Sequence, residues 1–113
     1  MALLATAATS LSIVVFPQGL GGPSEHSTLT CGPTGGTHPA RVAACRRLSA
    51  LSNPFRRIPE DAVCAEIYGG PDVARIVGTY KGRRIWIQVR RRNGCEIDRW
   101  DRLRPLLPAG GAA

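Results

Sequence analysis

The stretch RIVGTYKGRRIWIQVRR, residues 75–91, carries the clearest structural signal in the chain. Its two halves, residues 75–80 and 84–91, have the β-branched and aromatic composition of strands, and Lys81-Gly82 separates them. A two-residue connection ending in glycine between such halves is typical of a β-hairpin. In the second half every other residue is aliphatic, namely Ile85, Ile87 and Val89. We therefore predict a hairpin with one aliphatic face.

The N-terminal half predicts two strands followed by a helix. Residues 11–16 are rich in β-branched side chains and end before Pro17, and residues 28–31 form a second short strand before a Gly- and Pro-rich turn. Thr37 is placed to cap the helix that follows. Apolar residues then recur at every third position, at Val42, Cys45, Leu48 and Leu51. This stripe predicts that Cys45 lies on the buried face of the helix.

Four cysteines in a short chain are typical of a disulfide framework in an exported protein. Three pairings are possible among Cys31, Cys45, Cys64 and Cys95. A structural zinc site usually takes close pairs of ligands such as C-x-x-C, and the sequence has none. His26 and His38 lie in Ser-, Thr- and Gly-rich stretches typical of surface histidines. We therefore expect disulfides and a secreted, extracellular protein, with no metal and no cofactor.

The chain of 113 residues has 15 Lys and Arg against 8 Asp and Glu, a formal net charge of +7. This charge favours anionic partners, nucleic acids among them. The densest basic run lies along the predicted hairpin, where Trp86 is the one nearby aromatic platform. We interpret residues 83–92 as a solvated strand face and turn, and expect no nucleic-acid partner. No apolar run reaches the ~18 residues needed to cross a membrane, so we expect no membrane partner.

The length fits one domain with a modest core. Residues 1–9 are mostly apolar and contain Ala5-Thr6-Ala7, which is similar to a signal-peptidase site, so we interpret them as a signal-peptide remnant or a disordered N-terminus. Residues 10–107 are predicted to form the domain. Residues 108–113 are predicted to be a disordered tail.

Several short motifs resemble the Streptomyces subtilisin inhibitor family, whose members are secreted inhibitors of serine proteases. The resemblance runs from about Leu11 to Glu96, with nearly the same cysteine spacing. The motifs are Thr28-Leu29-Thr30-Cys31, Gly36-Thr37-His38-Pro39, Cys45, Cys64-x-x-x-Tyr68, Gly82-Arg83-Arg84 and Asn93-x-Cys95. So many local motifs in one order make chance agreement improbable.

The resemblance implies an α+β fold in which a five-stranded antiparallel sheet carries two helices on one side. It also implies two disulfides, Cys31 with Cys45 and Cys64 with Cys95, and a homodimer formed through the sheet. The partner would be a serine endopeptidase, either subtilisin-like or chymotrypsin-like. The chain would then be no enzyme, and its two histidines and scattered carboxylates likewise offer no catalytic site.

The resemblance assigns a reactive loop as well. Glu66 matches the residue that fills the specificity pocket of the protease, and Glu66-Ile67 matches the scissile bond. Asn93 matches an asparagine that supports the loop by hydrogen bonding. The flanking residues that match protease contacts are Val63, Cys64, Ala65 and Tyr68.

Three features of this loop depart from the family pattern. Glu66 stands where large apolar or basic residues are commoner, which predicts a preference for glutamate-specific proteases over broad subtilisin-like ones. Ala65 replaces a proline, and Tyr68-Gly69-Gly70-Pro71 replaces Tyr-Asp-Pro, so we expect a less rigid loop. The alternative function is a non-inhibitory secreted binding protein of the same fold, whose basic face meets an anionic partner.

Overall fold

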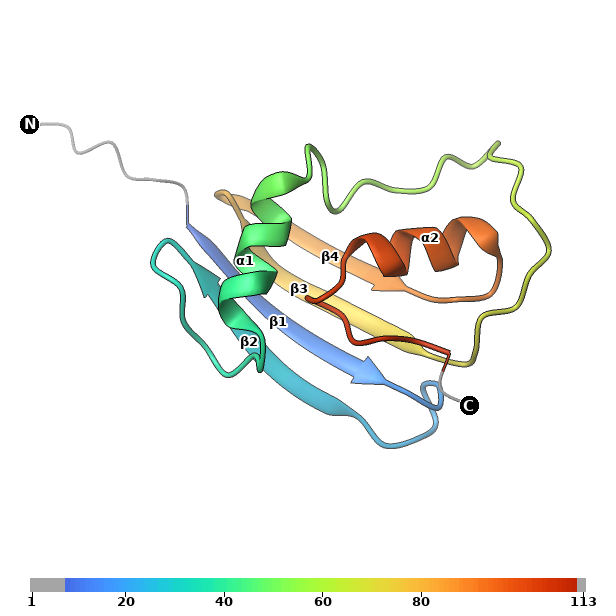
Figure 1. Ribbon diagram of the computed structural model, residues 1–113, viewed down its shortest axis with the longest axis horizontal. Coiled ribbons are helices and arrows are strands. Elements are labelled where there is room, and N and C mark those ends of the chain that lie inside the picture. Colours follow the sequence, from blue (N-terminus) through green and yellow to red (C-terminus); the bar gives the residue numbers. More distant parts are fainter. Residues whose placement is uncertain (1–7, 112–113) are drawn as a thin grey trace, which may run out of the picture.

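The predicted hairpin is present and forms one edge of the sheet (Figure 1). The computed structural model describes residues 8–111 of the chain. In it β3 (Val73–Tyr80) and β4 (Arg83–Val89) pair antiparallel around Lys81 and Gly82. Both turn residues have positive φ, 48° and 82°. A two-residue turn with positive φ matches the right-handed twist of the paired strands. Glycine at the second position adopts positive φ without strain.

The two N-terminal strands complete the sheet. β1 (Thr9–Phe16) lies between β3 and β2 (Glu25–Cys31), and it pairs antiparallel with both. Every second residue of β1 is buried, which is the pattern of a strand with one face on a core. The short strand predicted at residues 28–31 is present as the C-terminal half of β2, which begins three residues earlier.

The sheet has four strands in the order β2-β1-β3-β4, so the five strands implied by the family resemblance are wrong for this chain. Residues 51–72 form no strand. Three prolines in this segment, Pro54, Pro59 and Pro71, lack the backbone N–H that a ladder requires. Its contact with the end of β4 is an isolated backbone bond, Gly69 N to Arg91 O at 2.8 Å, instead of a run of paired residues.

The first helix, α1 (Arg41–Ala50), begins later than its predicted cap. Thr37 pairs with Thr28 of β2 instead, where its hydroxyl accepts a hydrogen bond from Thr28 N at 2.9 Å. The predicted three-residue stripe is also wrong at Val42, which is 60% exposed, because the helix repeats every 3.6 residues. Ala44 and Leu48 supply the buried stripe at a spacing of four.

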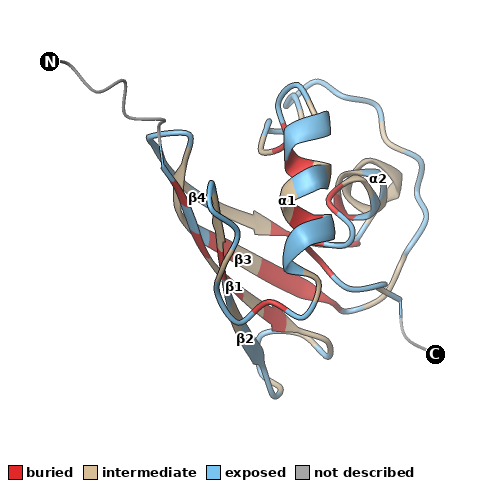
Figure 2. Ribbon diagram, turned by 60° about the vertical axis from the view of Figure 1, so that its left-hand side comes forward, coloured by how far each residue is buried: buried red, intermediate tan, exposed pale blue. Residues whose placement is uncertain are grey.

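The second helix, α2 (Gly94–Arg102), packs beside α1 on the same face of the sheet, as the resemblance implied (Figure 1). Figure 2 shows buried residues along the strands and in the two helices that lie over one face of the sheet. Trp100 of α2 is fully buried, and burying a large apolar side chain stabilises a fold by roughly 1.5–3 kcal/mol. The core also includes Leu11, Ile13, Leu29, Leu48, Ile76, Leu103, Leu106 and Leu107.

Both predicted disulfides are present. Cys31 of β2 is bonded to Cys45 of α1, and Cys64 is bonded to Cys95 of α2. These are the pairs that the family resemblance implied, and each bond attaches one helix to another part of the chain. The expectation of a surface histidine is wrong at His38, which is 4% exposed because its Nε2 donates a hydrogen bond to Leu106 O at 2.8 Å.

The described residues reach slightly beyond the predicted domain at both ends. Thr9 opens β1, while residues 1–7 of the predicted leader remnant lie outside the described part. In the predicted tail, Pro108 O accepts a hydrogen bond from Trp100 Nε1 at 2.8 Å, and Gly111 N donates to Asp72 Oδ1 at 3.1 Å. Residues 112–113 are also outside the described part. No helix within residues 8–111 has the length and apolar character needed to cross a membrane.

Candidate functional site

Residues 63–68 belong to the long connection between α1 and β3. Figure 1 shows this connection passing around the far side of α2 before it returns to the sheet. Ala65 and Glu66 are exposed, and so are the apolar side chains of Val63 (98%), Ile67 (57%) and Tyr68 (69%). Exposed apolar side chains that lie close together in the sequence are typical of a contact surface for another molecule.

The N-terminal side of this segment is fastened to the first turn of α2. The disulfide between Cys64 and Cys95 holds their Cα atoms 5.3 Å apart. One residue further on, Ala65 O accepts a hydrogen bond from Gly94 N at 2.8 Å. A Cβ atom at position 94 would lie 3.1 Å from the Cβ of Ala65, so the lack of a side chain at Gly94 permits this close approach.

Glu66 lies at the tip of a tight turn. Ala65 O also accepts a hydrogen bond from Ile67 N at 2.9 Å, which closes a three-residue turn with Glu66 at its centre. Glu66 is therefore held in a turn between the two attachment points of the segment, Cys64 and Gly69.

The C-terminal side of the segment is fastened by Arg91, which follows β4. Gly69 N donates to Arg91 O, and Arg91 Nε donates to Gly69 O, both at 2.8 Å. The same guanidinium pairs with Asp101 of α2 at 2.9 Å and lies 5.7 Å from the centre of the Trp100 ring. Arg91 is only 8% exposed. It therefore joins the loop, the end of the sheet and α2 in one contact network.

The prediction that Arg91 belongs to a solvated basic face is wrong, because this residue is buried. Its position contained a usable signal. Counting in steps of two from Ile87 and Val89 places residue 91 on the core side. A charged side chain on that side needs hydrogen-bonding partners, and the loop carbonyl of Gly69 and the carboxylate of Asp101 supply them.

The two glycines of the loop, Gly69 and Gly70, lie close to other parts of the chain. A Cβ atom on Gly69 would lie 2.6 Å from Cγ1 of Ile97, so a side chain there would push the loop away from α2. Gly70 has a φ of 115°, which side chains rarely tolerate, and a Cβ atom there would lie 2.9 Å from Gly111. Both glycines therefore allow the loop to pack closely.

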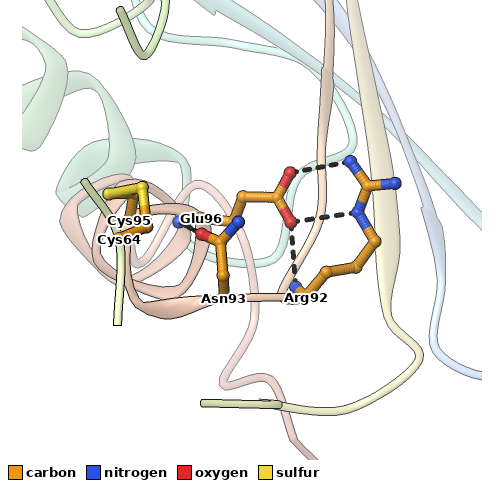
Figure 3. Close-up of polar contacts among 5 residues, drawn as sticks. All are labelled: Cys64, Arg92, Asn93, Cys95 and Glu96. Carbon is orange, nitrogen blue, oxygen red and sulfur yellow. Dashed lines mark hydrogen bonds and ion pairs between the residues drawn. A yellow bond between two sulfur atoms is a disulfide. The ribbon is translucent and has the colours of Figure 1, made fainter. Parts of the chain in front are cut away.

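Asn93 acts on the helix that holds the loop. Its side-chain oxygen accepts a hydrogen bond from Glu96 N at 3.0 Å and caps α2 (Figure 3). The Glu96 carboxylate accepts hydrogen bonds from Arg92, from its backbone N at 2.9 Å and from its guanidinium at 3.0 and 3.1 Å. The side-chain hydrogen bond from Arg92 lowers the pKa of Glu96, against the effect of burial. This arrangement resembles a capping box and fixes the turn that carries Gly94 and Cys95.

Comparison with known proteins identifies the family of this chain. The chain matches the family described as subtilisin inhibitor-like over residues 7–93, well over half of its length. It is 38% identical over 78 residues to subtilisin inhibitor-like protein 5 of Streptomyces fradiae, covering 66% of this chain and 72% of that protein. It is 33% identical over 79 residues to the subtilisin inhibitor of Streptomyces albogriseolus, covering 67% of this chain and 54% of that protein.

A third relative, a protein of Streptomyces lividans named protease inhibitor, is 39% identical over 75 residues, which cover 65% of this chain and 52% of that protein. These relatives are named as inhibitors and not as enzymes. The matched region contains the sheet, α1 and the exposed loop with its cysteine. The chain therefore belongs to the subtilisin inhibitor-like family, a family of protease inhibitors.

Proposed function

We propose that this protein is a secreted inhibitor of serine endopeptidases that presents residues 63–68 to the protease as a substrate would, with Glu66-Ile67 as the scissile bond. The main support is the attachment of an exposed segment at both ends. Cys64 and Ala65 are fastened to α2 on one side of Glu66, and Gly69 is fastened to Arg91 on the other. The inhibitor names of the relatives support the same function.

Two physical consequences of this attachment favour inhibition over rapid cleavage. A loop that is already ordered loses little conformational entropy on binding, so more of its contact energy appears as affinity. If the bond after Glu66 is cut, Cys64 and Gly69 remain held by the same sheet end and helix. The new amine then stays close to the acyl-enzyme, so resealing competes with hydrolysis.

Glu66 decides which proteases fit best. Its carboxylate would lose hydration in an apolar specificity pocket and meet repulsion in an acidic one, and either effect costs several kcal/mol. A pocket with cations or hydrogen-bond donors would compensate for this loss. We therefore propose a preference for glutamate-specific serine proteases, with weaker binding to subtilisin-like and chymotrypsin-like enzymes of broad specificity.

Inhibition constants against a panel of proteases test this proposal. We expect binding to a glutamate-specific serine protease to be at least about tenfold tighter than to a broad subtilisin-like protease, because desolvation of Glu66 opposes the latter. The panel should include a chymotrypsin-like enzyme with an apolar pocket. Equal potency against all classes would contradict the role of Glu66, and no inhibition of any would contradict the proposed function.

The alternative, a non-inhibitory binding protein, rests on the exposed Arg83 and Arg84 at the start of β4. The rest of the basic run is less available, because Arg91 is paired with Asp101 and Arg92 with Glu96. Salt separates the two functions. Binding through exposed arginines should weaken steeply as salt rises. Inhibition through a loop that becomes buried in the active site of the protease should persist at moderate salt.

The homodimer implied by the family resemblance stays a prediction, and we propose that it uses the outer face of the sheet. Val77 and Trp86 lie directly opposite each other on β3 and β4, with 38% and 63% of their surface exposed. In sedimentation equilibrium, Trp86→Lys should weaken dimerisation by about a hundredfold, since central aromatic residues dominate interfaces. Val42→Lys, on α1, should leave the dimer intact. Equal effects of the two variants would place the interface elsewhere.

A further inference from the structure

A basic hollow separates α2 from the part of the long connection that precedes the loop. Its volume is about 160 Å³. Figure 1 shows this part of the connection running beside α2. Four arginines line the hollow, Arg56 and Arg57 from the connection and Arg99 and Arg102 from α2. One acidic side chain, Asp98, lines it with them. Side chains from both walls therefore bring positive charge to one place.

The charge in this hollow is only partly compensated within the protein. Asp98 pairs with Arg102 at 3.0 Å. Within residues 8–111, the ion pairs found do not include Arg56, Arg57 or Arg99. Because like charges repel at short distance, three such guanidinium groups around one hollow favour a bound anion.

Arg99 gives the second observation. Its Nε is buried, and it has no hydrogen-bond partner among the described residues. Burial lowers the pKa of Arg99, and the positive charges of Arg57 and Arg102 lower this pKa further. The carboxylate of Glu96 acts in the opposite direction. The rest of the Arg99 side chain is half-buried. A buried N–H without an acceptor in its own chain is uncommon in folded proteins, because the desolvation of this donor is then uncompensated. An acceptor oxygen of a bound anion would compensate for it.

We propose that this hollow is a binding site for a phosphoryl oxyanion, either free orthophosphate or one unit of a polyphosphate chain. A tetrahedral oxyanion offers several acceptor oxygens to converging guanidinium groups, including one to the unpartnered Arg99 Nε. Arg57 also lines a neighbouring hollow with Arg83 and Arg84, so a chain of phosphoryl groups would find further arginines there. Bound anion would tie the connection to α2, close to Cys95.

Titration of the whole ¹⁵N-labelled protein with sodium phosphate, at constant ionic strength maintained with chloride, tests the site. We expect a saturable shift of the Arg99 Nε–H resonance. Arg99→Gln should weaken phosphate binding by about tenfold or more, since a charge-assisted hydrogen bond contributes that much. Arg57→Gln, at an exposed residue with little risk to folding, should also weaken it. Arg46→Gln, at an exposed residue of α1 outside the hollow, should leave binding unchanged.

Two results would overturn the site. One is an Arg99 resonance that does not respond to phosphate. The other is an equal loss of binding in the Arg46, Arg57 and Arg99 variants, which would indicate diffuse attraction by net charge.

A second titration with polyphosphate distinguishes the two sources of the ligand. If the chain is the ligand, it should bind more tightly than orthophosphate, and Arg83→Gln should reduce that advantage. If orthophosphate is the ligand, Arg83→Gln should change neither titration. The site would bind its anion whether or not the loop inhibits a protease.

Discussion

Replacing both cysteines of the loop disulfide, as Cys64→Ser/Cys95→Ser, should convert the protein from an inhibitor into a substrate that is cut and released. The bond spans 31 residues, so losing it should lower the free energy of unfolding by about 3–4 kcal/mol by chain-entropy estimates. The functional effect should be larger than this loss alone predicts. Without the bond, the hydrogen bond from Gly94 N to Ala65 O is the remaining attachment described near residues 64–65.

The second disulfide provides the matched control. Cys31→Ser/Cys45→Ser removes a bond that spans 14 residues, which should cost about 3 kcal/mol of stability. This bond joins β2 to α1 and does not attach the loop, so inhibition should survive wherever the variant remains folded. Denaturant unfolding, inhibition constants and the rate of cleavage after residue 66 should be measured on both variants. Equal loss of inhibition would show that global stability, not loop attachment, controls activity.

The hairpin and the disulfides were the most predictable parts of the fold. Lys81-Gly82 between two strand-like runs gives a local signal, because a two-residue turn needs residues that accept positive φ. The start of α1 was missed because Thr37 has two possible partners. It can cap a helix, but in the fold it pairs with Thr28 of β2, a contact that depends on where the preceding strand lies.

The family resemblance implies five strands, but the composition of residues 51–72 leaves this chain with four. Prolines and glycines between residues 51 and 72 prevent a continuous ladder, so this region serves as a long connection. Lacking a strand of its own, the loop depends on side-chain and single backbone contacts to hold its position.

The motif from Cys64 to Tyr68 predicts a reactive loop, and the resemblance predicts its disulfide, but the other contacts of this segment are not readable from the sequence. Ala65 to Tyr68 are exposed, while the role of the segment stays a prediction. Arg91 and Gly94 were missed because their roles depend on the path of the loop past α2. Gly94, Cys95 and Asp101 also lie after residue 93, where the family match ends. The contacts that hold the loop therefore extend beyond the matched region.

Replacing Glu66 should change the target of inhibition with the largest effect of any exposed substitution. Glu66→Lys should strengthen binding to trypsin-like proteases, whose specificity pocket contains a carboxylate, by about a hundredfold or more, since it turns repulsion into a charge pair. Glu66→Met should instead favour subtilisin-like enzymes by removing the cost of burying a carboxylate. Both variants should lose affinity for a glutamate-specific protease, as measured by inhibition constants.

The control must separate the local role of Glu66 from the effect of net charge. Glu60→Lys makes the same change of charge at another exposed residue of the connection, outside the loop. Long-range attraction changes association with any acidic or basic protease and is screened by salt, so it would affect both variants alike. A side chain inside a pocket changes selectivity between proteases and resists salt. If Glu60→Lys shifts selectivity as much as Glu66→Lys does, residue 66 does not enter the pocket and the reactive bond lies elsewhere in the loop.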